Sequence, residues 1–299
     1  MAEATPIQTI SMQGVQVWVK REDLNHLIVQ GNKLHKLKHN LIAARRQQAK
    51  TLVTFGGAYS NHLLATAYAA QKSGFKSVGI VRGDELKHAE AHWSETLQHC
   101  RQFGMQLEFV SRADYRFKQQ SETVQGLIND LDSTFIIPEG GSNLAAIQGV
   151  AEWLVAMDKQ LKAKPTHVFC PVGTGGTLAG MIAGCAQIPW QCEIIGISVL
   201  KGLHSVKNDI NQWLSTYNQD LKLPSWQINH QFHGGGYAKS TADMLNFGKQ
   251  FKVSNNVPLD KIYNLKSFYA LDTLIQQAVI EPGDRPLIIH TGGLQGGIA

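Results

Sequence analysis

The stretch HVFCPVGTGGTLAGM, residues 167–181, joins an apolar run to a glycine-rich turn and the start of a helical pattern. The run from 167 to 172 does not alternate in polarity, which is typical of a strand buried on both faces. Similar runs are TLVTF (51–55), SVGIV (77–81), LEFV (107–110), TFIIP (134–138), EIIGISV (193–199) and PLIIH (286–290). Segments of helical length separate them, including 60–72, 89–103, 144–161 and 177–187. This alternation predicts an α/β fold with open, mainly parallel sheets.

The overall composition is that of a globular protein. Of 299 residues, 43% are hydrophobic and 17% are charged, which excludes wholesale disorder. The apolar runs are too short to span a bilayer, and the start MAEATPIQTISMQG lacks the features of a secretory signal. Four cysteines without a C-x-x-C pair favour a reducing cytoplasm over a disulfide scaffold. The net charge of +5 comes without a clustered basic face, so we expect neither nucleic acid nor membrane as a partner.

Glycine turns follow four of the predicted strands directly. They lie at 56–57, 140–141, 173–176 and 292–293. Glycine lets the backbone turn sharply and approach a ligand closely. In open parallel sheets, ligands bind beyond the carboxyl ends of the strands. We therefore expect the four turns to form one shared site on one edge of a sheet.

The turn at 173–176 has the character of an anion site. Its backbone N–H groups and the following helix start would attract a phosphate, and Thr174 and Thr177 add hydroxyl donors. The alternative is a tight turn with Thr177 as a helix cap. A dinucleotide fingerprint fails because Leu178 takes the position of its last glycine, and no Walker loop occurs. The pattern favours a compact monophosphate.

Two further segments carry candidate chemistry. Lys33 follows Gly31-Asn32 at a helix start, where the helix dipole disfavours an ammonium, as a Schiff-base lysine requires. Lys36, one turn on, faces either an anionic ligand or solvent. The segment Ser60-Asn61-His62 opens another helix after the glycine turn at 56–57. It serves either as a helix cap or as a site for a carboxylate and a ring oxygen.

Together these segments resemble the pyridoxal-phosphate-dependent enzymes that include 1-aminocyclopropane-1-carboxylate (ACC) deaminase and D-cysteine desulfhydrase. The resemblance runs from Lys20 to Gly293 and rests on GNKLHKL (31–37), GGAYSNH (56–62), PVGTGGTLAG (171–180) and HTGG (290–293). It implies the tryptophan-synthase-β-like fold, known as fold type II. It also implies a large domain of residues 1–44 and 146–299, a small α/β domain of residues 45–145, and pyridoxal 5'-phosphate between them. A homodimer is expected from the same resemblance.

The resemblance also implies roles for single residues. Lys33 would carry the cofactor and act as the base, with Lys36 beside it. Asn61 would meet the phenolic oxygen of the cofactor, and Asn264 would meet its pyridine nitrogen. The phosphate cup would consist of Gly173, Thr174, Gly175, Gly176 and Thr177. The substrate, a small amino acid, would contact Ser60, Asn61, His62, Tyr237, Tyr263 and Thr291, of which Ser60, Tyr237 and Tyr263 are also expected to be catalytic.

Departures from the family pattern bear on the reaction. His35 stands where the family often has Arg. ACC deaminases carry Glu at position 264 and Leu at 291, whereas desulfhydrases carry hydroxyl residues at both, so Thr291 and His62 resemble the desulfhydrases. Asn264 matches neither group and cannot hold a ring proton as a carboxylate does. The expected reaction is therefore β-elimination from D-cysteine to pyruvate, ammonia and sulfide.

Alternatives remain open at this point. The protein could be an ACC deaminase that forms 2-oxobutyrate and ammonia, or could eliminate from cysteate or a chlorinated alanine. A non-catalytic protein that binds a phosphorylated metabolite is the alternative of another class. No metal site is expected, because His88 and His92, four apart on a predicted helix, lack a third ligand, and His230 and His233 lack partners.

Overall fold

The computed structural model describes residues 4–299, whose strands form two sheets. The larger sheet has six strands, in the order β1 (Ile7–Met12), β2 (Val15–Arg21), β10 (Pro286–His290), β7 (His167–Val172), β8 (Glu193–Ser198) and β9 (Ser225–Asn229). The smaller has four, in the order β5 (Met105–Val110), β4 (Lys76–Arg82), β3 (Thr51–Gly56) and β6 (Thr134–Ile137). All neighbours are parallel except the antiparallel pair β1–β2.

Each of the seven predicted strands is present, so the predicted α/β fold with mainly parallel sheets is confirmed. Three strands were not predicted from the sequence: β1, β2 and β9. In β1 and β9 most positions are at least partly exposed, so neither reads as a continuous apolar run. In β2 the first residues alternate between buried and exposed, which is the pattern of a strand near a sheet edge.

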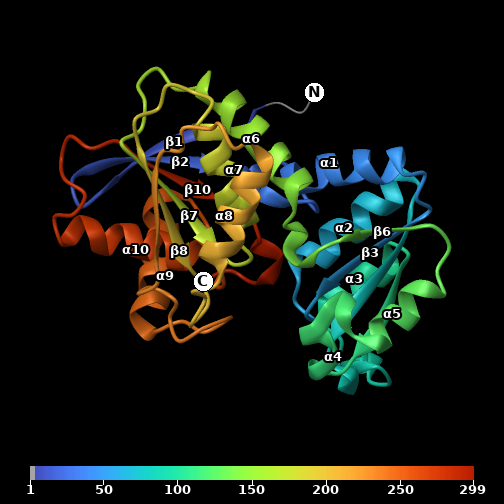
Figure 1. The fold of residues 1–299 in the computed structure, drawn as a ribbon. Coiled ribbons are helices and arrows are strands. Elements are labelled where there is room, and N and C mark those ends of the chain that lie inside the picture. Colours follow the sequence, from blue (N-terminus) through green and yellow to red (C-terminus); the bar gives the residue numbers. More distant parts are fainter. Residues whose placement is uncertain (1–3) are drawn as a thin grey trace.

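Helices flank both sheets (Figure 1). They are α1 (Asn32–Arg46), α2 (Asn61–Ser73), α3 (Glu95–Gln102), α4 (Arg112–Phe117), α5 (Glu122–Asn129), α6 (Leu144–Asp158), α7 (Gly176–Cys185), α8 (Val206–Tyr217), α9 (Ala242–Asn255) and α10 (Asn264–Gln276). Short 3-10 turns lie at 22–24, 84–86, 90–92, 118–120, 139–141 and 294–296. None of the helices in residues 4–299 combines the length and apolarity needed to cross a membrane.

The predicted helix over 89–103 is wrong in its first half. Ser94 caps α3 by accepting a hydrogen bond from Leu97 N, so the helix begins only at Glu95. His92 belongs to a separate 3-10 turn and His88 lies in a turn before it, so the two histidines do not share a helix. Within residues 4–299, no three His, Cys, Asp or Glu side chains gather as a metal site.

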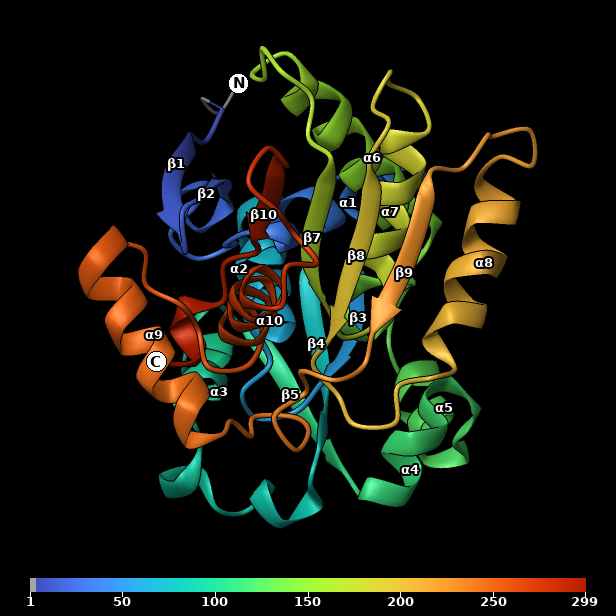
Figure 2. The ribbon, with the colours of Figure 1, turned by 90° about the vertical axis from the view of Figure 1, so that its left-hand side faces the viewer.

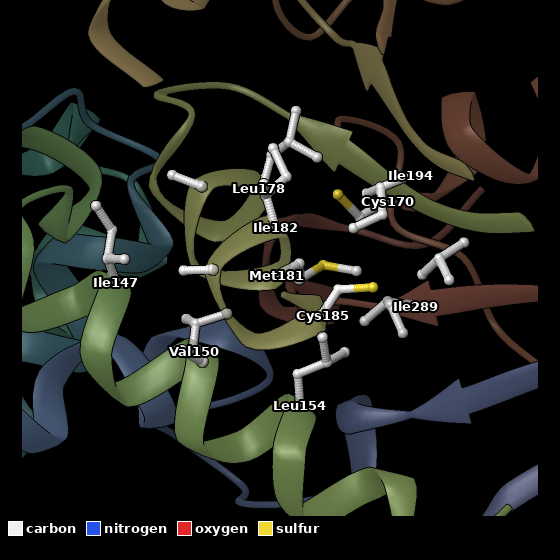
Figure 3. Packing of buried hydrophobic residues seen from close by; sticks show 14 of the residues in the cluster. Ile147, Val150, Leu154, Cys170, Leu178, Met181, Ile182, Cys185, Ile194 and Ile289 are labelled. Atoms are coloured by element: carbon white, nitrogen blue, oxygen red, sulfur yellow. The ribbon is translucent and has the colours of Figure 1, made fainter. Parts of the chain in front are cut away.

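One core of the larger part lies between its sheet and the pair α6–α7, and a second, on the opposite face of the sheet, includes residues of α9 and α10. Figure 3 shows Ile147, Val150 and Leu154 of α6 facing Leu178 and Ile182 of α7. All ten residues of α7 are buried. The two helices approach so closely that a β-carbon at position 180 would lie 2.5 Å from Val150 Cβ, and the glycine at this position makes that approach possible. This packing holds the amino end of α7 in place.

The two sheets lie in separate parts of the molecule, side by side in Figure 1 and one behind the other in Figure 2. Helix α1 leads from β2 in the larger sheet to β3 in the smaller, and α6 leads back from β6 to β7. The boundaries between the predicted domains, 44–45 and 145–146, fall within the last turn of α1 and the first turn of α6. They remain a prediction.

Candidate active site

The four glycine turns line one cavity of about 300 Å³. The turns after β3 and β6 come from the smaller sheet, and those after β7 and β10 come from the larger. The expectation of one shared site is therefore met, but its placement on one edge of a single sheet is wrong. The carboxyl ends of strands from two sheets enclose the cavity.

Lys33 lies in the wall of this cavity, on the first turn of α1. Its Nζ donates to Asn32 Oδ1 at 2.8 Å. Burial lowers the pKa of Lys33 to about 8, against the opposing effect of the Asp260 carboxylate. The direction of this shift is the one predicted from the position of Lys33 at a helix start, and burial is its main cause in the structure.

The glycine-rich turn after β7 presents an uncapped helix end. Gly175 precedes α7 with a φ of 81°, and no side chain caps the first turn. Thr177 is not a cap, because its Oγ1 accepts a hydrogen bond from Asn32 Nδ2 at 2.8 Å. Gly176 packs against Ser142, behind the cavity surface, while its neighbours in the turn line the cavity. The N–H groups of this turn are the donors that an anion would need.

Lys36 stands beside this turn and is 2% exposed. Its Nζ donates to Gly140 O at 2.6 Å and to Ser142 Oγ at 2.9 Å, and Ser142 Oγ lies 2.6 Å from Thr174 Oγ1. Burial and the nearby charge of Lys33 hold the pKa of Lys36 well below its ordinary value. The solvent-facing alternative for Lys36 is therefore wrong.

The segment Ser60-Asn61-His62 forms the amino end of α2. Ser60 caps this helix by accepting from Leu63 N at 3.3 Å, so the cap interpretation holds for it. Asn61 Oδ1 and His62 Nδ1 are buried and have no partner among the described residues. Both residues line the cavity. Two unused polar atoms here indicate that a ligand completes the site.

The ring of His62 is held in one tautomer. Its Nε2 lies 2.8 Å from Thr54 Oγ1, whose hydroxyl hydrogen goes to Ile137 O at 2.8 Å. Nε2 must therefore donate, which leaves a lone pair on Nδ1. Burial and the charges of Lys33 and Lys36 hold the pKa of His62 well below its ordinary value, so the ring is neutral at pH 7.

Two tyrosines lie at the cavity. Tyr237 is 40% exposed and follows three consecutive glycines, whereas Tyr263 is half-buried and directly precedes α10. Burial raises the pKa of Tyr263 well above its ordinary value, with Tyr237 and Asp260 adding to the effect. The Tyr263 hydroxyl therefore keeps its proton at neutral pH and can act as a donor.

Asn264 is fully buried behind the cavity wall. Its Nδ2 donates to Asp260 Oδ1 at 2.5 Å and to Gly292 O at 2.7 Å, and its Oδ1 accepts from Thr291 N at 2.9 Å and Thr291 Oγ1 at 3.3 Å. The amide has no donor or acceptor left for a ligand. The expected contact of Asn264 with a cofactor ring does not fit this geometry. Thr291 lines the cavity in its place.

Several residues of the site were not predicted from the sequence, among them Arg82, Glu139 and, behind the lining, Asp260. Asp260 caps the start of α10 and accepts hydrogen bonds from Ile262 N, Tyr263 N and Asn264 N. Arg82 and Glu139 line the cavity and also a second hollow beyond it. Each of these two directly follows a predicted apolar strand, and that position at a strand end was the available signal.

Arg82 and Glu139 differ in how their charges are used. Glu139 accepts from the Tyr115 hydroxyl at 2.5 Å and pairs with Lys118 at 3.0 Å. Arg82 makes no hydrogen bond or ion pair within residues 4–299, and its guanidinium stands 5.8 Å from the centre of the Tyr115 ring. The outer side of the cavity therefore offers one uncompensated cation.

His35, which departs from the family pattern, lies outside the cavity lining. Its Nε2 lies 2.6 Å from Glu22 Oε2, and its ring stacks on Trp153 with centroids 4.9 Å apart. Thr5 and Asn25 also donate to Glu22. The substitution therefore belongs to a buried polar network beside α1, not to the ligand site.

Two mainly parallel β-sheets whose strand ends enclose a lysine of lowered pKa and an uncapped glycine turn define a cofactor-binding α/β enzyme of fold type II. The family model described as "Pyridoxal-phosphate dependent enzyme" matches residues 3–292. The chain therefore belongs to the pyridoxal-phosphate-dependent enzymes, as the sequence motifs predicted.

Individual relatives agree with this family. A putative ACC deaminase of Pyrococcus abyssi is 32% identical over 98% of this chain and 90% of its own length. The bifunctional D-cysteine desulfhydrase/ACC deaminase of Arabidopsis thaliana, a mitochondrial protein, is 28% identical over 98% of this chain and 77% of its own. A solved structure described as an ACC deaminase homologue superposes with a TM-score of 0.86 at 25% identity, over 99% of this chain and 91% of that one.

The residues of the cavity fit pyridoxal 5'-phosphate. The uncapped turn before α7 supplies donors for a phosphate, and Lys33 supplies an amine of lowered pKa. The unpartnered amide oxygen of Asn61 shows that this side chain is not used by the protein itself. The cavity therefore has the donors, the amine and the unused polar group that the cofactor requires.

Proposed function

We propose that this protein catalyses β-elimination from a small amino acid, of the D-cysteine desulfhydrase type, with release of pyruvate, ammonia and sulfide. The observation that carries the proposal is the pairing of Thr291 and Asn264. Thr291 lines the cavity, and the Asn264 amide behind it is uncharged and fully used by Asp260, Gly292 and Thr291, so neither residue would offer a carboxylate to a cofactor ring nitrogen. Such a site suits a reaction with a good leaving group.

The cofactor would be held by the glycine turn at 173–177, by Lys36 through its contacts to that turn, by Asn61, and by Thr291. When bound, pyridoxal phosphate supplies an electron sink for the substrate α-carbon. Lys33 is the residue that carries it, because its Nζ lies in the cavity and its pKa is lowered to about 8. An amine with that pKa is also able to accept the α-proton at neutral pH.

The substrate carboxylate would lie at the amino end of α2, where Ser60 and His62 line the cavity and the helix dipole favours an anion. The protonated Tyr263 hydroxyl would donate to the departing sulfur, with Tyr237 beside it. Neutral His62 would accept a hydrogen bond at Nδ1. These roles place donors around the substrate and leave Lys33 as its base.

ACC deamination to 2-oxobutyrate and ammonia is the second candidate. It is supported by the names of the relatives from Pyrococcus abyssi and Arabidopsis thaliana, the second of which combines both activities. We further propose a cytoplasmic homodimer without nucleic-acid partners, divided into domains 1–44 with 146–299 and 45–145. Four buried free cysteines support the cytoplasmic location, and the division of the strands into two sheets supports the domain division. The homodimer is proposed from the family resemblance.

The deciding experiment is to load the purified protein with pyridoxal phosphate and to assay 2-oxo acid release from D-cysteine and from ACC side by side. Pyruvate from D-cysteine without 2-oxobutyrate from ACC is the expected result. Release of 2-oxobutyrate alone would establish the deaminase instead. Cofactor binding with no turnover of either compound, or of cysteate and chlorinated alanine, would favour a non-catalytic binding protein.

A further inference from the structure

Lys266 is a fully buried lysine at the third position of α10. Its Nζ donates to Val199 O at 2.9 Å and to Gly236 O at 2.7 Å. Burial lowers the pKa of Lys266 to about 8, with an opposing effect from Asp260. An ammonium in such a position is costly to bury, so its two charge-assisted hydrogen bonds must serve the structure around it.

The two carbonyl groups belong to two different segments of the cavity. Val199 directly follows β8 and lines the cavity, and Gly236 directly precedes Tyr237, which also lines it. Lys266 itself lies one helical turn after Tyr263, at the start of the same helix. One ammonium therefore joins both segments to α10, the helix that Tyr263 directly precedes.

The segment that carries Tyr237 has little else to hold it. Gly234, Gly235 and Gly236 all adopt positive φ, at 63°, 101° and 128°. Consecutive glycines lose much conformational entropy on folding. Phe232, which is buried, and Ser240, whose Oγ donates to Lys261 O, bound this segment. Between them, the Tyr237 side chain interacts with the Tyr263 hydroxyl, and the bond from Lys266 to Gly236 O is the hydrogen bond in the described structure that ties the backbone of the segment to α10.

We propose that Lys266 is the positioning residue for Tyr237, holding it over the cavity in register with Tyr263. The role of Tyr237 toward a substrate rests on the proposed function, whereas the tether itself does not. Lys266 is absent from the cavity lining, so it acts through the segment it holds and not by contact with ligand. No feature of the motif KIYNLKS (261–267) reveals this from the sequence.

The tether is tested first without any activity measurement. Lys266→Met keeps the length of the side chain and removes its donors. Amide hydrogen exchange of the cofactor-free full-length chain is expected to rise about 10-fold or more in the peptide covering 231–240 and to change little in β7 and α7. Lys20→Met, which also removes a buried lysine with two oxygen acceptors, is the control and should leave that peptide unchanged. Unchanged exchange of 231–240 in Lys266→Met would overturn the proposal.

Action through Tyr237 is tested by a double-mutant cycle on the cofactor-loaded enzyme. Lys266→Met and Tyr237→Phe should each lower kcat/KM, and the double variant should be no slower than the slower single variant. Multiplying losses would overturn the assignment. The visible absorbance of the bound cofactor should stay as in the wild type.

If Lys266→Met does not fold, Lys266→Gln, which keeps a donor on a shorter chain, takes its place in both tests. If the wild type turns over no substrate, the proposed function fails while the exchange test still decides on the tether.

Discussion

Gly31 and Thr291 meet so closely that a β-carbon on residue 31 would lie 1.8 Å from the Thr291 carbonyl oxygen. Asn32 N donates to the same oxygen at 3.3 Å. The residue before the helix of Lys33 is thus fixed against the last glycine turn of the chain. Gly31 also adopts a φ of 68°, so two separate demands require glycine there.

Gly31→Ala is therefore expected to destabilise the protein by about 2–4 kcal/mol and to impair cofactor binding, because the backbone must shift to admit the methyl group. Gly14→Ala is the matched control. Gly14 also has positive φ, at 83°, but has open space around it, and should cost only about 1–2 kcal/mol. Urea unfolding of both variants measures the difference, and equal losses would refute the role of the close approach.

Lys33→Ala should abolish the visible absorbance of the lysine-bound cofactor together with turnover, because no other lysine in the cavity wall is free of hydrogen bonds to the protein backbone. The control is Lys38→Ala. Lys38 belongs to α1, like Lys33, but is exposed and pairs with Glu152 of α6, so its loss should leave the cofactor absorbance and the turnover unchanged. Absorption spectra and 2-oxo acid assays test this. Full turnover by Lys33→Ala would rule out the proposed mechanism.

Arg82→Gln should raise KM for an anionic amino acid about 10-fold with a smaller effect on kcat, because the variant removes the uncompensated cation at the cavity. The wild-type KM should also rise with salt, and that dependence should weaken in the variant. Arg112→Gln is the control, because it removes a cation that is paired with Glu85 and lines the second hollow but not the cavity. A KM unaffected by Arg82→Gln would show that this cation takes no part in binding.

Glu22 should make the protein sensitive to acid. Burial alone would raise the pKa of Glu22, but His35, Thr5 and Lys20 overcome this and lower it from 4.5 to about 2. A carboxyl with a lowered folded-state pKa stabilises the protein above 4.5, and this stability is lost as the pH falls from 4.5 toward 2. The difference corresponds to about 3 kcal/mol.

In Glu22→Gln the fall in unfolding free energy between pH 5 and pH 2.5 should accordingly be shallower than in the wild type, although the variant is less stable at pH 7. Urea midpoints across this range provide the measurement. Glu281→Gln, at an exposed position, serves as the control. Parallel pH profiles for Glu22→Gln and the wild type would contradict the assignment.

The strands of the two sheet centres were predictable because burial on both faces demands continuous apolar runs, as in 167–172 and 286–290. The strands β1 and β9, mostly part-exposed at the sheet edges, carry no such signal. The division of the glycine turns between two sheets could not be predicted either. Strand order depends on the crossover connections, and an apolar run in the sequence does not indicate which strand it pairs with.

The site was predictable where the residue type determines the backbone geometry, as glycine does in the turn at 173–176. It was not predictable at Asn264, because the direction of that side chain depends on Asp260, which accepts from both its backbone N–H and its amide. Spacing along the chain does not reveal that Thr291 lines the cavity while Asn264, to which it is hydrogen-bonded, lies behind the wall. Lys266 shows the same limit, since its partners lie 67 and 30 residues away.

The burial of α7 along its whole length limits which residues of the cavity can be substituted during evolution. A substitution in that helix disturbs the core on every side. Because the glycine turn leads directly into the helix, the sequence of the turn is constrained as well. Arg82 and Tyr237 stand at the exposed rim of the same cavity and touch little of the core. Descendants of this chain can therefore acquire new substrates by drift and selection at the rim while they inherit the cofactor anchor intact.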